Sequence, residues 1–416
     1  MAGSKNEMTA TFQSGKGSPL KIYRPKLEKT PKILEAYWCD ENEAKTTLLA
    51  HKANAYVLIK AENLDGKKVT IKVFEYDTGE SNDDFIHEYE WTYSRTNMRY
   101  FLDVSPEMFV KGEEDLVHFY FTLAIEDADP VPYCNADDKH LKIHLVRYVP
   151  EIMTSLGWDV GAKLQDEWFG REANDDPDLV EPDLSIVKMD WALGFSDAKA
   201  AHDSIFTRKL WVSTNGKPAL IKEIKRMVTD GIVTLPTKAG SSAEFGVFRN
   251  SVITHKHKKA PKAGRIPTFD KYHYNESPYN EGYMSALFSS LDGLTAGLAN
   301  FVFRMSSGGT ITKTETGYTI KVTKVATYVR DSFDFIDEDE TDPQTLGYWN
   351  MEKQKVSKTP GVISSGYRHI ENPSYRNYRD EFNMGGDYRL FSDLKYTTVS
   401  DSFDVTTAKY DAIVVD

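Results

Sequence analysis

The stretch that decides the fold is FVFRMSSGGTITKTETGYTIKVTKVATY, residues 301–328. Apolar side chains recur at alternate positions in both halves of it, which is the period of a β-strand. The Gly308-Gly309 pair between the halves predicts a turn, because glycine adopts backbone angles that other residues avoid. We therefore expect a β-hairpin. The alternating residues are Phe301, Phe303 and Met305 before the turn and Ile320, Val322, Ala326 and Tyr328 after it.

Patterns upstream of this hairpin are mostly helical. Apolar residues recur every three or four positions over 153–168 and again over 284–298, and the segment 218–231 has Pro in its first turn and Gly just past its end. Residues 187–195 alternate and predict a strand instead. Together these patterns predict an α+β domain over residues 149–416, with a mainly antiparallel sheet in its C-terminal half.

The part of the chain before residue 149 has strand periodicity without helices. About seven short apolar runs separated by turn-rich segments predict an all-β sandwich over residues 31–148. The Asp65-Gly66 pair lies between two of these runs and predicts a tight hairpin. Residues 1–30 are rich in Gly, Ser, Thr and Lys and are expected to form a flexible leader.

Composition excludes several classes of protein. The chain has 416 residues, with 51 Lys and Arg against 63 Asp and Glu, and a formal charge of −12. This charge opposes general nucleic-acid binding and a polybasic membrane role. No run approaches the ~20 apolar residues of a membrane span, and the N-terminus lacks the apolar core of a signal peptide, so we expect no transmembrane segment and synthesis in the cytoplasm. Two cysteines exclude a disulfide framework.

The segment 269–276, FDKYHYNE, is the leading candidate site. It places Asp270, His273 and Glu276 close together, and a carboxylate beside an imidazole can carry out acid–base catalysis or hold a metal. We predict these three residues as catalytic. The alternative is an ordered surface loop with no chemistry. The spacing matches no metal motif, and no dinucleotide or phosphate-loop fingerprint is present, so metal and cofactor are left unknown.

Three segments carry dense charge. Residues 249–265, RNSVITHKHKKAPKAGR, are basic without an acid and could meet phosphates, an anionic surface or an acidic partner, or simply form a basic loop. Residues 330–343, RDSFDFIDEDETDP, are acidic but lack the EF-hand order of calcium ligands, which favours a solvated loop. Residues 174–182, NDDPDLVEP, predict an exposed acidic loop.

The second part of the chain contains a series of short motifs, which are Leu156-Gly157-Trp158, Gly161–Leu164, Trp168-Phe169, Lys188–Leu193, Phe269–His273, Leu298–Phe301, Tyr328–Phe335 and Leu346–Trp349. In this order the motifs resemble a bacterial domain family of unknown function whose members are encoded beside type VI secretion components in Gram-negative bacteria. The likeness covers about Val149–Asp416 and implies no reaction or catalytic residue. Residues 36–40 and 57–69 are similar to an Ig-like module of secreted or injection-associated proteins of Bacteroidetes.

These resemblances imply a secreted effector of a contractile injection system, an antibacterial toxin of unknown activity used in interbacterial competition. The β-sandwich would be the adaptor and the larger domain the active part. A secretion spike or tube component and an immunity protein are the expected partners. The alternative is a non-catalytic structural or adaptor protein that binds the spike or another effector, so enzymatic activity is left open.

Overall fold

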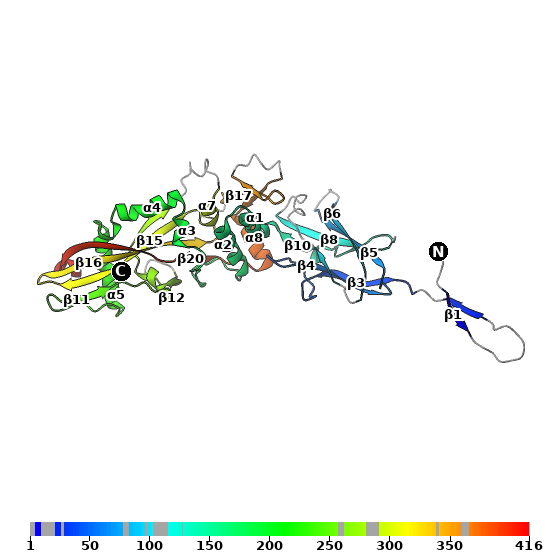
Figure 1. Cartoon of the computed structure of the whole chain (residues 1–416), viewed down its shortest axis with the longest axis horizontal. Helices are drawn as coiled ribbons and strands as arrows, with labels where there is room; N and C mark the ends of the chain where they lie inside the picture. The colour runs from blue at the N-terminus through cyan, green and yellow to red at the C-terminus, as the bar shows by residue number, and fades with distance from the viewer. Residues whose placement is uncertain are drawn as a thin grey trace, which may run out of the picture. The chain divides into compact units, whose positions relative to one another are not determined.

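The computed structural model describes residues 5–9, 21–25, 29–77, 83–95, 99–102, 115–126, 128–256, 262–279, 291–337, 341–358 and 366–415 (Figure 1). The chain divides into two compact units, Met1–Ile143 and His144–Asp416. The division falls slightly before the boundary that the sequence predicts at 148/149.

The leader contains regular structure. Strands β1 (Lys5–Thr9) and β2 (Lys21–Pro25) pair in antiparallel fashion. The expectation that residues 1–30 hold no regular element is therefore wrong for these two segments. It relied on the scarcity of apolar residues, whereas a two-stranded ladder is formed by backbone hydrogen bonds.

The first unit contains two further antiparallel sheets. One has the order β3-β4-β7 and the other β10-β8-β5-β6, with β9 paired to β8. Trp38 joins them, because its indole nitrogen donates to the Phe119 carbonyl oxygen at 3.2 Å and its ring lies 4.8 Å from that of Phe121. The elements are β3 (Lys32–Cys39), β4 (Ala55–Glu62), β5 (Lys68–Glu75), β6 (Asp84–Thr92), β7 (Arg99–Leu102), β8 (Leu116–Ile125), β9 (Val131–Tyr133), the 3₁₀ helix η2 (Asp137–Lys139) and β10 (Leu141–His144).

The hairpin predicted at Asp65-Gly66 is wrong. Gly66 does adopt a positive φ of 78°, but strands β4 and β5 on either side of it belong to different sheets. The Asp-Gly pair correctly marks a tight reversal, but β4 pairs with β3 and β7, whereas β5 pairs with β6 and β8.

The second unit begins with helices. The single face predicted over 153–168 is divided between α1 and α2, because Gly157 adopts a φ of 76° between them. The helix predicted over 218–231 is confirmed as α5. The helices are η3 (Leu145–Tyr148), α1 (Val149–Ser155), α2 (Asp159–Gly170), α3 (Met189–Ala192), α4 (Ser196–Thr207), η4 (Leu210–Val212), α5 (Gly216–Thr229), η5 (Thr268–Tyr272), α7 (Gly293–Gly297), α8 (Asn372–Phe382) and α9 (Thr407–Ala412).

Two further predictions need correction or restriction. Residues 187–195 contain the short helix α3 and no strand, so the strand prediction is wrong. The Asp393 carboxylate accepts from the Met189 N–H at 2.8 Å and thereby caps the start of this helix. An alternation over five apolar positions is too short to exclude a helix. Of the helix predicted over 284–298, the structure describes only the C-terminal part, where α7 lies; residues 284–290 are outside the described residues.

A six-stranded antiparallel sheet forms the centre of the second unit. Its main order is β11-β15-β16-β20, with β14 paired to β15 and β21 paired to β16. The unit thus combines helices with antiparallel sheets, as the α+β prediction requires. The strands are β11 (Ser242–Phe245), β12 (Val252–His255), β13 (Gly264–Pro267), β14 (Asn275–Tyr279), β15 (Phe301–Lys313), β16 (Gly317–Phe333), β17 (Thr345–Asn350), β18 (Lys355–Ser357), β19 (Arg368–Glu371), β20 (Tyr388–Phe391) and β21 (Lys395–Thr406).

The β15–β16 hairpin exists, but its turn is not at Gly308-Gly309. Those glycines lie inside β15 at a β-bulge, and the chain reverses after Thr314, whose N–H donates to the Gly317 carbonyl oxygen at 2.9 Å. A Cβ atom on Gly309 would collide with the Lys321 carbonyl oxygen. Glycine is therefore needed here for close approach of two strands.

Strand β21 forms one edge of this sheet. It pairs with β16 over most of its length, and its residues are alternately exposed. Among the described residues, no helix combines the length and apolar character that a membrane crossing requires.

Candidate functional site

The register of the central sheet brings three arginines to one face. Arg304 on β15 lies opposite Tyr328 on β16, and Arg330 lies two residues further along β16. Arg330 is opposite Phe391 on β20, two residues from Arg389. Residues opposite one another, or two apart on one strand, share a face. The three arginines thus form a diagonal row across three adjacent strands.

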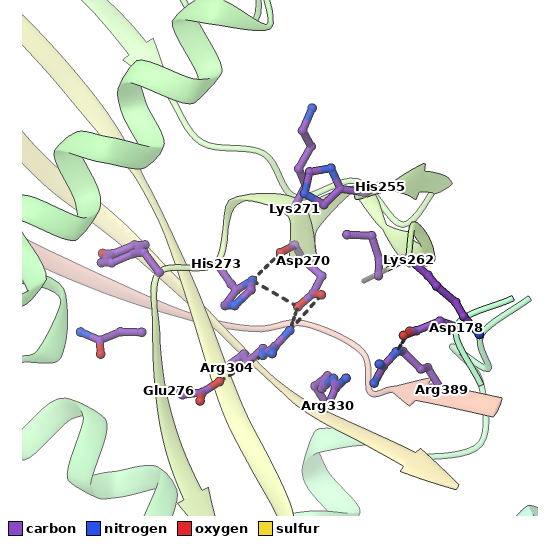
Figure 2. A pocket seen from close by; sticks show the side chains of 14 residues that line it. Asp178, His255, Lys262, Asp270, Lys271, His273, Glu276, Arg304, Arg330 and Arg389 are labelled. Atoms are coloured by element: carbon purple, nitrogen blue, oxygen red, sulfur yellow. Dashed lines mark hydrogen bonds and ion pairs between the residues drawn. The ribbon is translucent and has the colours of Figure 1, made fainter. Parts of the chain in front are cut away.

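The row lies on a cleft of about 650 Å³. Figure 2 shows its lining side chains, with Arg330 between Arg304 and the Arg389–Asp178 pair. The lining comes from the central sheet, from η5, from the β12–β13 ribbon and from the loop that contains Asp178. The three predicted residues Asp270, His273 and Glu276 all line this cleft, while their catalytic role stays a prediction.

Asp270 is buried in an ion pair with Arg304. Its side chain is only 4% exposed, and Arg304 Nη1 donates to both carboxylate oxygens at 3.0 Å. The Tyr328 hydroxyl donates to Oδ1 at 2.7 Å. Burial alone would raise the Asp270 pKa, but the charge of Arg304 and the further contacts outweigh it and lower that pKa. Asp270 is therefore held ionised, and it fixes the position of Arg304.

His273 uses its Nδ1 in contacts with Asp270 and leaves its Nε2 available as an acceptor. Its Nδ1 lies 2.6 Å from the Asp270 carbonyl oxygen and 3.7 Å from the Asp270 carboxylate. A carbonyl only accepts, so Nδ1 carries the proton and Nε2 of the neutral ring is an acceptor. Burial lowers the His273 pKa, although the Asp270 charge acts in the opposite direction. With 27% of its side chain exposed, His273 is a neutral base at the cleft.

Glu276 is tied to the same network. It lies on β14 directly opposite Arg304, and its Oε2 accepts from Arg304 Nε at 3.2 Å. Nearly half of its side chain is exposed. Arg304 consequently holds a buried carboxylate and a solvent-facing one at the same time.

Arg330 differs from its two neighbours in the row. Its Nε is buried and has no hydrogen-bond partner among the described residues, which provide no carboxylate within ion-pair distance of its guanidinium either. A buried donor without a partner costs roughly 1–3 kcal/mol. Arg330 therefore has free capacity to bind an anion that enters the cleft.

The acidic loop 174–182 meets the basic segment 249–265 at this cleft. Asp176 pairs with Lys262, and Glu181 pairs with Arg265. The Asp178 carbonyl oxygen accepts from the Arg265 N–H at 2.9 Å, while its carboxylate binds Arg389 Nε. The two segments, which the sequence analysis treated as separate loops, thus neutralise each other.

Comparison with protein families identifies the family to which the chain belongs. A model described as a family of unknown function, DUF6402, matches residues 145–407. The chain belongs to the DUF6402 family. The expectation of a family of unknown function over Val149–Asp416 is thereby confirmed. No curated protein and no solved structure gives a significant match.

The remaining sequence candidates in the DUF6402 unit are dispersed. His255 and Lys262 line the cleft, whereas His257, Lys258 and Lys259 lie outside the described residues. In the acidic segment 330–343, Asp337 pairs with Arg376 at 2.8 Å and Asp331 has a pKa well above its ordinary value because it is buried. The described residues contain no group of His, Cys, Asp and Glu side chains suited to a metal ion.

The sequence patterns did not single out Arg304 or Arg389. Arg330 was noted only in the acidic segment, beside Asp331 at the end of a strand and on the opposite face from it. Each stands alone in its own strand, and the three come together only through strand pairing. The available signal was alternation, because a charged residue between two buried apolar residues of a strand, such as Arg304 between Phe303 and Met305, marks a polar face.

Proposed function

We propose that the DUF6402 unit binds an oxyanion-bearing ligand in the arginine cleft and that His273 acts on it as an acid–base group. The observation that carries this proposal is the guanidinium of Arg330, which faces the cleft with a buried Nε that lacks a partner among the described residues. Arginine binds phosphate and carboxylate groups through its fork of N–H donors. A cleft with such a donor is suited to an anionic ligand.

In this proposal the acid–base chemistry belongs to His273 Nε2. The Asp270 carbonyl oxygen fixes the tautomer, and a lowered pKa keeps the ring neutral near pH 7. The Asp270–Arg304 pair orients both the ring and the guanidinium. Nε2 would then accept a proton from water or from a hydroxyl group of the ligand.

We further propose that the whole chain is a type VI secretion-associated effector, an antibacterial toxin exported by a contractile injection system. The motif order noted over Val149–Asp416 supports this assignment. The first unit would be the adaptor, of the Ig-like kind that residues 36–40 and 57–69 resemble. A spike or tube component and an immunity protein would be its partners.

The alternative is a non-catalytic adaptor, and one observation favours it. Both carboxylate oxygens of Asp270 are occupied by Arg304, and one also by Tyr328. A carboxylate used in this way is common in structural ion-pair networks.

Growth of a bacterial host separates the two functions. The full chain is expressed in the cytoplasm and, with an added export signal, in the periplasm. We expect growth inhibition in one compartment and its loss in His273→Ala, since removal of an acid–base group costs ~10²–10⁴ in rate. Circular dichroism of the purified variant must match the wild type.

His369→Ala is the matched control. His369 lies on β19, and its Nε2 is hydrogen-bonded to the Thr345 hydroxyl at 3.0 Å. It does not line the cleft, so this variant should remain toxic. Full toxicity of a folded His273→Ala would remove His273 from the mechanism. Absence of toxicity in both compartments, together with stable binding of a spike protein, would establish the adaptor.

A further inference from the structure

The ligand chemistry of the cleft can be narrowed from the arrangement of Arg330, Arg389 and Asp178. Arg389 donates through Nε to Asp178 and through Nη1 to the Ser332 hydroxyl at 2.9 Å. Its Nη2 has no hydrogen bond or ion pair within the described part of the chain. Arg330 and Arg389 are diagonal neighbours on paired antiparallel strands, a spacing that long side chains can bridge. One anion can therefore contact both guanidinium groups.

Asp178 is held where an anionic ligand would be bound. Its N–H donates to Asp176 Oδ1 at 3.1 Å, and its side chain lies against Gly264, where a Cβ atom would come within 3.0 Å of Asp178 Oδ1. About a third of the carboxylate side chain is exposed. The Asp178–Arg389 pair is thus partly buried, and its carboxylate is the more exposed of the two partners. A second anion that enters the cleft can compete with this carboxylate for the Arg389 guanidinium.

We infer that Arg330 and Arg389 form a phosphate-binding subsite and that Asp178 is an internal carboxylate which the phosphate group of a phosphomonoester displaces from Arg389. The inference rests on the proposed function, because it names the anion that the cleft takes. The terminal oxygens of a tetrahedral phosphate point in different directions and can accept from two arginines on different strands, whereas the two oxygens of a carboxylate lie in one plane and match one arginine fork.

Charge balance favours a dianion. Arg330 and Arg389 carry two positive charges, and Asp178 compensates one of them. When Asp178 withdraws, a phosphomonoester dianion compensates both. A phosphodiester carries one negative charge and would leave one guanidinium without compensation unless Asp178 stayed in place.

The neighbouring residues place this subsite beside the acid–base group. Arg304, opposite Tyr328, lies between Arg330 and His273 and donates through Nη1 to Asp270 and through Nε to Glu276. It therefore remains a fixed positive charge while Arg330 and Arg389 take the phosphate. The rest of the ligand would extend toward His273.

Calorimetry on the full chain tests the subsite, with inorganic phosphate, a nucleoside monophosphate and dimethyl phosphate as probes. We expect Arg330→Gln to weaken binding of the first two by roughly tenfold to a hundredfold, the value of a charge-assisted hydrogen bond. The structure describes no side-chain hydrogen bond or ion pair of Arg330, so the substitution breaks no such contact and this variant should fold normally. Arg330→Lys, which keeps the charge without the fork, should recover part of the affinity.

Asp178→Asn tests the displacement. Without the competing carboxylate, phosphate should bind roughly fivefold more tightly or better, because fivefold is the upper value for an exposed ion pair and this pair is partly buried. Lys199→Gln is the matched control for Arg330→Gln, because it also removes one positive charge but from α4 outside the cleft, and it should leave binding unchanged. Tighter binding of dimethyl phosphate than of inorganic phosphate would overturn the dianion assignment.

The two proposals fail in different ways. Equal phosphate affinity in the wild type and Arg330→Gln, or no phosphate binding by the wild type, overturns the subsite even if His273→Ala abolishes toxicity. Unchanged affinity in Asp178→Asn overturns the displacement. Phosphate binding that depends on Arg330, in a chain without toxicity in either compartment, supports the subsite and contradicts the effector.

Discussion

At the scale of single residues, the cleft is organised by which charges are already paired. Arg304 holds two carboxylates, Arg389 holds one, and Arg330 holds none within the described chain. Pairing a buried arginine is stabilising mainly because an unpaired buried charge is costly. The residues most tightly bound are thus positioning residues, and the ones with free capacity are the candidates for ligand contact.

Glu223 provides a prediction about pH and stability. It is buried on α5, and burial raises its pKa to about 7 even though Arg226 lies 2.9 Å away. The unfolded chain loses this proton near its ordinary pKa of 4.5, while the folded chain retains it. The contribution of Glu223 to stability therefore falls as pH rises from 4.5 to 7, by about 3 kcal/mol in total.

Glu223→Gln should remove this dependence. We expect its free energy of unfolding to equal that of the wild type at pH 4 and to exceed it at pH 8, measured by urea denaturation. The difference between the two proteins isolates Glu223 from other titrating groups. Parallel curves across this pH range would show that Glu223 does not titrate abnormally.

At the scale of elements, the periodicity of apolar residues predicted several helices and strands correctly but did not predict which strands pair. The alternation of Phe301, Phe303 and Met305 identified β15, and Pro218 identified α5. Two-residue turn signals failed at Asp65-Gly66 and Gly308-Gly309, because glycine also serves close strand approach and positive φ outside hairpins.

Prediction of the cleft was also limited to contacts between residues that are near in sequence. The local cluster of Asp270, His273 and Glu276 was visible because its members are near in sequence. Strand pairing alone brings together Arg304 on β15, Arg330 on β16 and Arg389 on β20. The patterns in a single sequence do not show which strands pair. The meeting of loop 174–182 with segment 249–265 was hidden for the same reason, although their opposite charges were evident.

The bulge glycine of β15 gives a prediction at this scale. Gly309→Ala places a Cβ atom against the Lys321 carbonyl oxygen and should destabilise the chain by about 1–3 kcal/mol through overpacking. Gly170→Ala is the matched control. Among the described residues, no atom beyond its chain neighbours and the backbone of α2 lies within 4 Å of the added Cβ, so stability should be unchanged or slightly higher. Equal melting temperatures for both variants would contradict the assigned role of Gly309.

At the scale of the whole molecule, the division at Ile143/His144 determines which fragment should fold. The 3₁₀ helix η3 belongs to the second unit, where it contacts α1 and α8, and its Leu145, Val146 and Tyr148 are buried. We expect a fragment of residues 144–416 to be folded. A fragment of residues 149–416, cut at the boundary that the sequence predicts, should be less stable by about 3 kcal/mol or more, because burial of each such side chain contributes ~1.5–3 kcal/mol.

Denaturant unfolding of the two fragments measures this difference directly. The longer fragment should show one cooperative transition and bind phosphate as the full chain does. If residues 149–416 are as stable as residues 144–416, then η3 is a connector rather than part of the second core.

The exposed edge strand β21 bears on how copies of this chain behave at high concentration. A long unpaired edge invites a strand from another molecule, and proteins oppose this with charged side chains on the edge. In β21 these charges are engaged locally, since Lys395 pairs with Asp190 and Asp401 with Lys209. Together with the exposed Asp404, these two ion pairs are the charged groups that oppose aggregation at this edge. Because salt screens them, the chain should be more soluble in dilute buffer than in concentrated salt.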